Sequence, residues 1–474
     1  MNAMESPLEL TGEQLRVLVN AAMDRIAPHI DSLPQQPAAD VAGGVELARS
    51  LVEPLPRYGC SPNEVLDLIF DRLVPKSFNT AGPGYLAYIP GGGIPHSAVA
   101  DMIADAVNRY VGVWVAAPGL AQLEANVVRW FCEIVGYGPD SRGFLTSGGS
   151  LANFSAVVAA RRKLLPDDFL KGTIYASDQV HHSVQKAAML AGFHAEATRM
   201  VGSDDLFRIR LDELERRIAE DRSENRTPFL VVGSAGTTNT GAVDNLWGLA
   251  DLAEHHDMWF HVDGAYGGFF MLTERGSAVM QGIERSDSVV LDPHKGMFLP
   301  YGTGSLLVSD GTALMRSHTV NADYMPPMQD EEDLVDFCQI SPELSRPFRG
   351  LAVWLPVKLL GIEPFTKSLD EKLDLARWAA EQLRSIDGIE IVAEPQLSIV
   401  AFRFSRPGLS SDALNELNRD FIARVNSLQR VYLTGTMLTN RFTMRICVLS
   451  FRTHMDRMEQ CIADIRETAR VLGR

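Results

Sequence analysis

A lysine that directly follows a short apolar segment is the first candidate for chemistry in this chain. Lys295 stands in the sequence LDPHKG, after the apolar residues 288–291. Lysine is rarely placed at the edge of a core without a task, and partial desolvation lowers the pKa of its amine, which can then form a Schiff base. A lone lysine is more often a surface residue on a turn, so this chemistry depends on its companions.

An aspartate in a comparable position is the first companion. Asp263 follows the apolar residues 259–262 and precedes the small residues Gly264 and Ala265. A carboxylate there could cap the next helix. Beside a Schiff-base lysine, it could instead keep the pyridine nitrogen of pyridoxal phosphate protonated, which makes the cofactor ring an electron sink.

A glycine- and serine-rich loop is the candidate for binding the cofactor's phosphate. Residues 146–150, TSGGS, follow an apolar segment and open an amphipathic stretch at Leu151. Backbone N–H groups at a helix start, together with hydroxyls, form an anion site, although such loops also occur as plain connections. Neither G-x-G-x-x-G nor G-x-x-x-x-G-K-[ST] occurs, which disfavours dinucleotide and nucleoside triphosphate binding.

Two pairs of adjacent histidines are candidate metal ligands. His181 and His182 follow another apolar segment, but no further His or Cys lies at metal-ligand spacing, so no metal site is predicted. His181 could instead stack on a cofactor ring. His255 and His256 end an amphipathic stretch and are expected at the surface.

Composition limits the class of protein. The chain has 474 residues, 46% of them hydrophobic, and a formal net charge of −16, which disfavours nucleic acid and anionic membrane as partners. No apolar run approaches the length of a spanning helix, and the N-terminus has no secretory pattern. Five scattered cysteines without a CxxC pair suggest neither a disulfide framework nor a zinc ribbon. A cytoplasmic enzyme is therefore predicted.

The organisation along the chain predicts three units. Residues 1–80 read as a helical arm without a core of its own, which should pack on another domain or subunit. Within residues 81–355, short apolar runs alternate with amphipathic stretches, which predicts an α/β domain on a largely parallel sheet. Its last two apolar runs have no long helix between them, so one of these two strands could be antiparallel, since a parallel connection usually needs a helical crossover. Residues 356–474 read as a smaller α+β domain. Because active sites lie at the carboxyl ends of such strands, the residues above are well placed.

Five motifs together resemble the group II pyridoxal-phosphate decarboxylases, which include aromatic-L-amino-acid and tyrosine decarboxylases. They are residues 146–153, 178–184, 236–238, 261–266 and 293–295, and the similarity runs from about Pro83 to the C-terminus. The resemblance implies pyridoxal 5′-phosphate as cofactor and the aspartate-aminotransferase fold (fold type I) with a mostly parallel seven-stranded sheet. It also implies a homodimer with sites at the subunit interface.

The resemblance implies a role for each matching residue. Lys295 would hold the cofactor as a Schiff base, Asp263 would pair with the pyridine nitrogen, and His181 would stack over the ring and contact the substrate carboxylate. The remaining implied cofactor contacts are Gly149, Ser150, Asp292 and His294 at the phosphate, Ala265 beneath the ring and Thr238 near the 3′-oxygen. Asp292 departs from the asparagine that the family often has.

The implied substrate is an aromatic L-amino acid, decarboxylated to the amine and carbon dioxide. Tyr85, Tyr88, Trp114 and Tyr301 match substrate-lining positions and would form an apolar wall. A dicarboxylic substrate would instead need an arginine, and none is apparent in the matching segments.

Phe337 supports an alternative reaction. A match anchored on Arg349 and Trp354 places it where the family has a loop tyrosine that protonates the substrate Cα. Family members with phenylalanine there can carry out oxygen-dependent decarboxylation and deamination to an aldehyde. A packing phenylalanine, with another proton donor nearby, explains the residue equally well. An aminotransferase and a non-catalytic binding protein on the same fold are the further alternatives.

Overall fold

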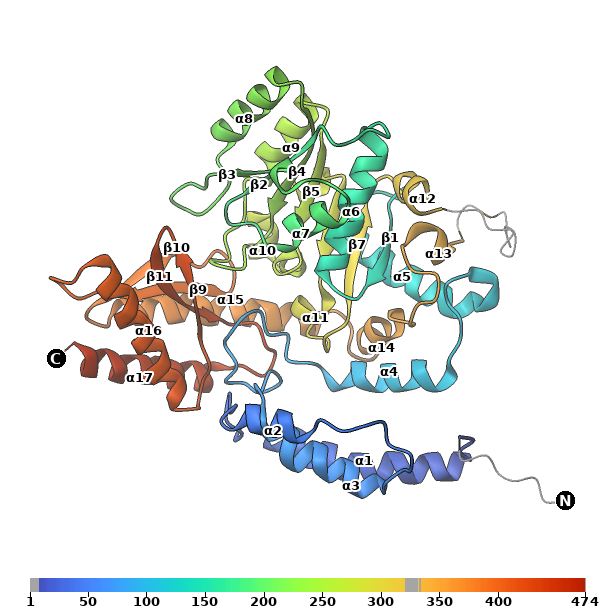
Figure 1. The fold of residues 1–474 in the computed structure, drawn as a ribbon, viewed down its shortest axis with the longest axis vertical. Coiled ribbons are helices and arrows are strands. Elements are labelled where there is room, and N and C mark those ends of the chain that lie inside the picture. The colour runs from blue at the N-terminus through green and yellow to red at the C-terminus, as the bar shows by residue number, and fades with distance from the viewer. Residues whose placement is uncertain (1–7, 320–330, 332–333, 474) are drawn as a thin grey trace.

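The chain forms an N-terminal arm, a large α/β unit and a smaller C-terminal unit (Figure 1). The computed structural model describes residues 8–319, 331 and 334–473. The arm consists of α1 (Gly12–Ser32), α2 (Gly44–Ser50) and α3 (Pro62–Asp67), which continues as a π-helical segment, Leu68–Leu73. No residue of these three helices is buried, so they form no core of their own. None of the described helices is long and apolar enough to cross a membrane.

The large unit is built on a seven-stranded sheet, which confirms the predicted fold class. The strand order is β1-β7-β6-β5-β4-β2-β3. Only β7 is antiparallel to its neighbours β1 and β6, and it lies in the part of the chain where no long helix separates two strands. The strands are β1 (Arg142–Thr146), β2 (Gly172–Ser177), β3 (Thr198–Val201), β4 (Thr227–Ser234), β5 (Trp259–Asp263), β6 (Ser288–Leu291) and β7 (Gly304–Val308).

Helices cover the sheet on both faces, and the two faces carry separate hydrophobic cores. Successive strand residues point to opposite faces, so Leu230 and Val232 of β4 join one core while Val231 joins the other. The helices are α5 (Pro118–Val135), α6 (Gly149–Leu164), α7 (Ser183–Leu190), α8 (Leu211–Ser223), α9 (Leu246–His255), α10 (Glu274–Val279), α11 (Pro293–Gly296) and α12 (Thr312–His318). Alanines of α6 pack on the sheet, which brings this helix close to the central strands.

The C-terminal unit has its own sheet and core. Its four antiparallel strands follow the order β10-β11-β9-β8 and are β8 (Ile389–Ala393), β9 (Ile399–Phe404), β10 (Thr434–Leu438) and β11 (Arg441–Cys447). The helices α15 (Glu363–Arg384), α16 (Ser411–Ser427) and α17 (Met455–Leu472) belong to it. The predicted boundary after residue 355 falls inside α14 (Gly350–Leu360), which packs on α4 (Pro95–Val107) and α5. Leu86 also joins the C-terminal core.

A buried ion pair ties three parts of the large unit together. Arg346 and Glu124 of α5 lie 2.5 Å apart, and both side chains are fully buried. Arg346 also donates to the Leu145 carbonyl of β1, and Glu124 accepts from the backbone of Gly350 at the start of α14. Removing one member of such a pair leaves an uncompensated buried charge, which is costly.

We therefore expect Glu124→Gln to lower the free energy of unfolding by about 3–5 kcal/mol. The measurement is urea denaturation of the cofactor-free protein, followed by circular dichroism. Glu363→Gln is the matched control. Glu363 Oε1 lies 3.4 Å from Lys367 Nζ on α15, but both side chains are exposed, and exposed ion pairs contribute little to stability. Equal destabilisation by both substitutions would contradict this interpretation of the buried pair.

Candidate active site

A cavity of about 310 Å³ lies at the carboxyl ends of the central strands. All nine residues predicted to contact the cofactor line it: Gly149, Ser150, His181, Thr238, Asp263, Ala265, Asp292, His294 and Lys295. They come from segments that follow β1, β2, β4, β5 and β6. Because these strands all end at one edge of the sheet, residues far apart in the sequence meet there.

Lys295 faces a buried carboxylate. It lies in α11, directly after β6, and its Nζ is 2.9 Å from Asp292 Oδ2. Asp292 is 1% exposed, and its second oxygen has no hydrogen-bond partner among the described residues. The amine of Lys295 is therefore held at the wall of the cavity, and Asp292 Oδ1 beside it can still accept a hydrogen bond.

The loop before α6 is packed too tightly for side chains. Gly148 has a φ of +153°, which residues with a Cβ rarely adopt. A Cβ on Gly149 would lie 3.0 Å from Asp292 Oδ2, and one on Gly304 would lie 2.6 Å from Asp292 Oδ1. Thr146 Oγ1 hydrogen-bonds the Gly148 backbone at both its N–H and its carbonyl. The N-terminus of the 16-residue helix α6 thus opens on the cavity, where its free N–H groups can bind an anion.

Asp263 and His181 complete the set. Asp263 ends β5 and is 8% exposed; its carboxylate accepts from Asn153 Nδ2 at 3.0 Å and from the backbone of Ala265 at 3.2 Å. His181 follows β2, and burial lowers its pKa below that of an ordinary imidazole, so the ring is neutral at pH 7. Helix start, amine and carboxylate in one cavity fit pyridoxal phosphate, which carries a phosphate, an aldehyde and a pyridine nitrogen.

Two residues beside this set were not assigned a role from the sequence. Asn153, which lines the cavity, and Ser183 fall inside the quoted motifs, yet nothing in those motifs singled them out. Asn153 is one turn after Gly149 on the alanine-rich face of α6, and it is 1% exposed. The sequence did contain a signal for Asn153, since it is a polar residue on a helix face that otherwise packs against the sheet.

The predicted substrate residues lie outside this cavity. Tyr85 is 3% exposed and stacks on Tyr432, with 5.9 Å between ring centroids, while Tyr88 and Tyr301 are exposed. The Trp114 backbone donates to Asp336 Oδ1 at 2.6 Å, and its buried Nε1 has no hydrogen-bond partner within the described chain. The substrate role of these four residues stays a prediction.

Phe337 also does not line the cavity that contains Lys295. Its ring is fully buried, 4.7 Å from the guanidinium of Arg346, and it lines a separate cavity of about 490 Å³ with residues of α5 such as Arg129. It begins the short helix α13 (Phe337–Ile340). In the described part of this one chain, Phe337 is therefore a packing residue, and its role in the reaction stays a prediction.

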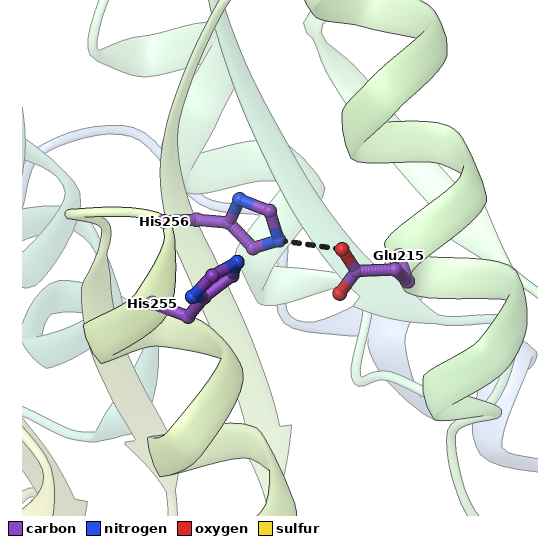
Figure 2. A group of neighbouring side chains, drawn as sticks. All are labelled: Glu215, His255 and His256. Carbon is purple, nitrogen blue, oxygen red and sulfur yellow. Dashed lines mark hydrogen bonds and ion pairs between the residues drawn. The ribbon is translucent and has the colours of Figure 1, made fainter.

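Outside the cavity, Glu215 of α8 lies beside His255 and His256 at the end of α9, and these three side chains are candidate metal ligands (Figure 2). The prediction that His256 lies at the surface is wrong, since it is 8% exposed; His255 is exposed as expected. His256 Nδ1 lies 2.9 Å from Arg222 Nη1, and Nε2 lies 2.9 Å from Glu215 Oε1. Arginine can only donate, so Nδ1 accepts and Nε2–H donates to Glu215. Neither nitrogen offers a free lone pair, and a guanidinium stands beside them.

The chain is similar to known proteins over most of its length. The profile of the pyridoxal-dependent decarboxylase conserved domain matches residues 62–405. An aromatic-L-amino-acid decarboxylase of Bacillus atrophaeus is 34% identical over 468 residues, which cover 98% of each chain. An L-2,4-diaminobutyrate decarboxylase of Acinetobacter baumannii is 25% identical over 94% of this chain and 91% of its own. The crystal structure of Catharanthus roseus tryptophan decarboxylase with L-tryptophan superposes with a TM-score of 0.90 at 26% identity, covering 98% and 100% of the chains.

For the cluster in Figure 2, we expect His256→Ala to lower the free energy of unfolding by about 1–3 kcal/mol, because Arg222 and Glu215 lose a shared partner. His255→Ala is the matched control and should change stability little. Thermal unfolding with and without EDTA provides the second measurement, and EDTA should leave the wild-type midpoint unchanged. A rise in that midpoint with Zn²⁺ that both substitutions abolish would instead establish a metal site.

Proposed function

Because the chain belongs to the pyridoxal-dependent decarboxylase family, whose cofactor is pyridoxal 5′-phosphate, we propose that it decarboxylates an aromatic L-amino acid to the amine. The observation that carries the proposal is the meeting of Lys295, Asp263, His181 and the start of α6 in one cavity. The described residues around that cavity include no arginine to bind a side-chain carboxylate. The relative that is 34% identical is named for aromatic substrates.

Each residue of the cavity has a distinct task in this proposal. When bound, the cofactor supplies an electron sink for the pair released from the Cα–carboxylate bond. Lys295 Nζ would hold the cofactor covalently through its amine. Asp263 holds a proton at the pyridine nitrogen, since a carboxylate stabilises that positive charge. Gly149, Ser150 and His294 would bind the phosphate at the start of α6.

Orientation is the remaining task of the protein. His181 lines the cavity and is placed to contact the substrate carboxylate. Ala265 and Thr238 also line the cavity, where Ala265 would contact the cofactor ring and Thr238 its 3′-oxygen. When the protein fixes the scissile bond in one orientation relative to the ring, the entropy of orientation is lost on binding. It is then not lost again in reaching the transition state, as it would be in solution. Asp292, 2.9 Å from Lys295 Nζ, positions the amine.

The aldehyde-forming alternative rests on Phe337 alone. Its burial beside Arg346 favours a packing role within this chain and gives no support to that alternative. The two reactions differ in their products, so one assay separates them. The complete set of Lys295, Asp263 and His181 weighs against a non-catalytic binding protein.

We further propose a homodimer, because the arm and helix α4 leave apolar side chains exposed. Leu15 and Leu18 of α1 are 45% and 41% exposed, although they share one helix face, and Val65 of α3 and Val99 and Met102 of α4 are also exposed. Apolar patches of this kind mark interaction surfaces. A second copy of the chain is the simplest partner, since closed two-fold symmetry is the commonest arrangement of soluble oligomers.

We expect the holoenzyme to absorb visible light and to release equal amounts of carbon dioxide and amine from an aromatic L-amino acid. Lys295→Ala should lose the visible band and lower turnover by roughly 10²–10⁴-fold or more, because the amine that binds the cofactor and moves protons is gone. The measurements are absorption spectra and product analysis under air across the common amino acids.

Lys163→Ala serves as the control, since this lysine lies on α6 away from the cavity and pairs with Asp310. An unchanged visible band in Lys295→Ala would overturn the assignment of Lys295. Aldehyde, ammonia and peroxide in place of the amine would establish the aldehyde-forming alternative.

For the dimer, light scattering should give about twice the 52.1 kDa mass of one chain. The double substitution Leu15→Asp and Leu18→Asp should raise the dissociation constant at least about tenfold, because it buries charge at the interface. Leu409→Asp with Val471→Asp, at comparably exposed positions of the C-terminal unit, is the control. A wild-type monomer that stays fully active at high dilution would contradict the proposal.

A further inference from the structure

We propose that Asn153 is a positioning residue, the branch point of a buried hydrogen-bond relay that places the proton of His181 on Nε2 and holds Asp263. Its catalytic consequence rests on the proposed function, whereas the position of the proton can be measured without substrate. Part of the relay lines the cavity and part lies behind it, and together its members link β5, β6, α6 and the start of α7.

The relay is continuous and buried. Trp259 Nε1 lies 2.7 Å from Ser288 Oγ, which lies 2.7 Å from His261 Nδ1. His261 Nε2 lies 2.8 Å from Asn153 Oδ1. Asn153 Nδ2 then reaches two groups, Asp263 Oδ2 at 3.0 Å and Ser183 Oγ at 2.9 Å. Ser183 Oγ is 2.8 Å from His181 Nδ1. The members between Trp259 and Ser183 are each at most 2% exposed, so water does not interrupt the chain.

The Asp263 end of the relay fixes the direction of its hydrogen bonds. A carboxylate can only accept, so the amide nitrogen of Asn153 must face Asp263 and the amide oxygen must face His261. His261 Nε2 therefore carries a proton and donates it to that oxygen. Burial lowers the pKa of His261, so the ring is neutral and its Nδ1 must accept.

The Trp259 end gives the same direction independently. An indole N–H can only donate, so Ser288 Oγ accepts from Trp259 and turns its own proton toward His261 Nδ1. A donor-only group at one end and an acceptor-only group at the other leave a single consistent arrangement. Reversing any one bond would place two donors or two acceptors against each other in a dry site, which is costly.

The branch to Ser183 carries this direction to the cavity. Asn153 Nδ2 donates its second proton to Ser183 Oγ, which leaves the hydroxyl proton of Ser183 for His181 Nδ1. The backbone N–H of Ser183 also lies 3.3 Å from that nitrogen. Two donors face Nδ1, and burial keeps the ring neutral, so the proton must sit on Nε2.

This proton position decides what His181 offers a substrate. Nε2 is the ring nitrogen for which the described residues provide no hydrogen-bond partner, and its N–H can donate to a carboxylate. The opposite tautomer would present a lone pair, which repels an anion. When a supporting residue no longer fixes the tautomer or orientation of a contacting side chain, the rate typically falls by about 10–100-fold, although the contacting side chain itself is intact.

The direct test measures the tautomer of His181 in the cofactor-free protein at pH 7. The protein is labelled with ¹⁵N-histidine, and His181 is assigned by the signal that disappears in His181→Asn. We expect the shifts of an unprotonated Nδ1 and a protonated Nε2 in the wild type. A proton on Nδ1, or on both nitrogens, would overturn the proposal without any variant.

Two substitutions test the cause. Asn153→Asp replaces the amide donor by an acceptor of the same shape, so the Ser183 hydroxyl should turn away and His181 should shift toward a protonated Nδ1. Ser183→Ala removes the hydroxyl without adding charge, and both tautomers should become populated. Both variants should lower kcat about 10–100-fold, with a smaller change in KM. A wild-type tautomer and kcat in both variants would refute the relay.

Asn418→Asp is the matched control. Asn418 is fully buried in α16 and hydrogen-bonds both backbone groups of Phe404, far from the cavity. It should lose stability but keep the His181 tautomer and the kcat of its folded fraction. A tautomer change in this control would overturn the proposal. A wild type with the expected tautomer but without decarboxylase activity would instead overturn the proposed function and leave the relay standing.

Discussion

The buried carboxylate of Asp263 needs hydrogen-bond donors, and the centre of the molecule is arranged to provide them. Asp263 ends a central strand, is 8% exposed and lies on the wall of the cavity. One donor is the backbone of Ala265, which the turn after β5 supplies locally. The other is Asn153, which comes from a helix more than a hundred residues earlier. The hydrogen bond from Asn153 therefore forms only if α6 is held against β5.

Helix α6 can lie close to β5 because the side chains on its face toward the sheet are small. Ala152, Ala156, Ala159 and Ala160 are buried there, and they allow a close approach that larger side chains would prevent. The first turn of α6 lies so close to Ala265 and Asp292 that a Cβ at Gly149 would crowd both of them. Anion binding at the helix start and support of Asp263 one turn later are thus two results of one packing arrangement.

Much of this arrangement could be predicted from the sequence, and the reason is topological. Lys295, Asp263 and His181 each follow an apolar strand, and parallel strands end at a common edge, so spacing along the chain predicts proximity in space. The relay could not be found this way, because Asn153 and His261 meet through side chains on different elements. The burial of His256 was missed because its partners, Arg222 and Glu215, lie on another helix. Tyr85, Trp114 and Phe337 matched family positions, but a match along the chain does not say which cavity a ring enters.

The C-terminal unit supports the site although none of its residues lines the cavity. Tyr266, in the turn after Asp263, hydrogen-bonds both the hydroxyl and the backbone N–H of Ser398. Asn239, in the loop after β4, accepts from Thr436 and Arg445 of the small sheet. The two loops that carry Asp263 and Thr238 are thereby fixed from outside the sheet that produces them. Strand ends are the least constrained part of an open sheet, so a second unit docked on them supplies rigidity that the strands alone do not.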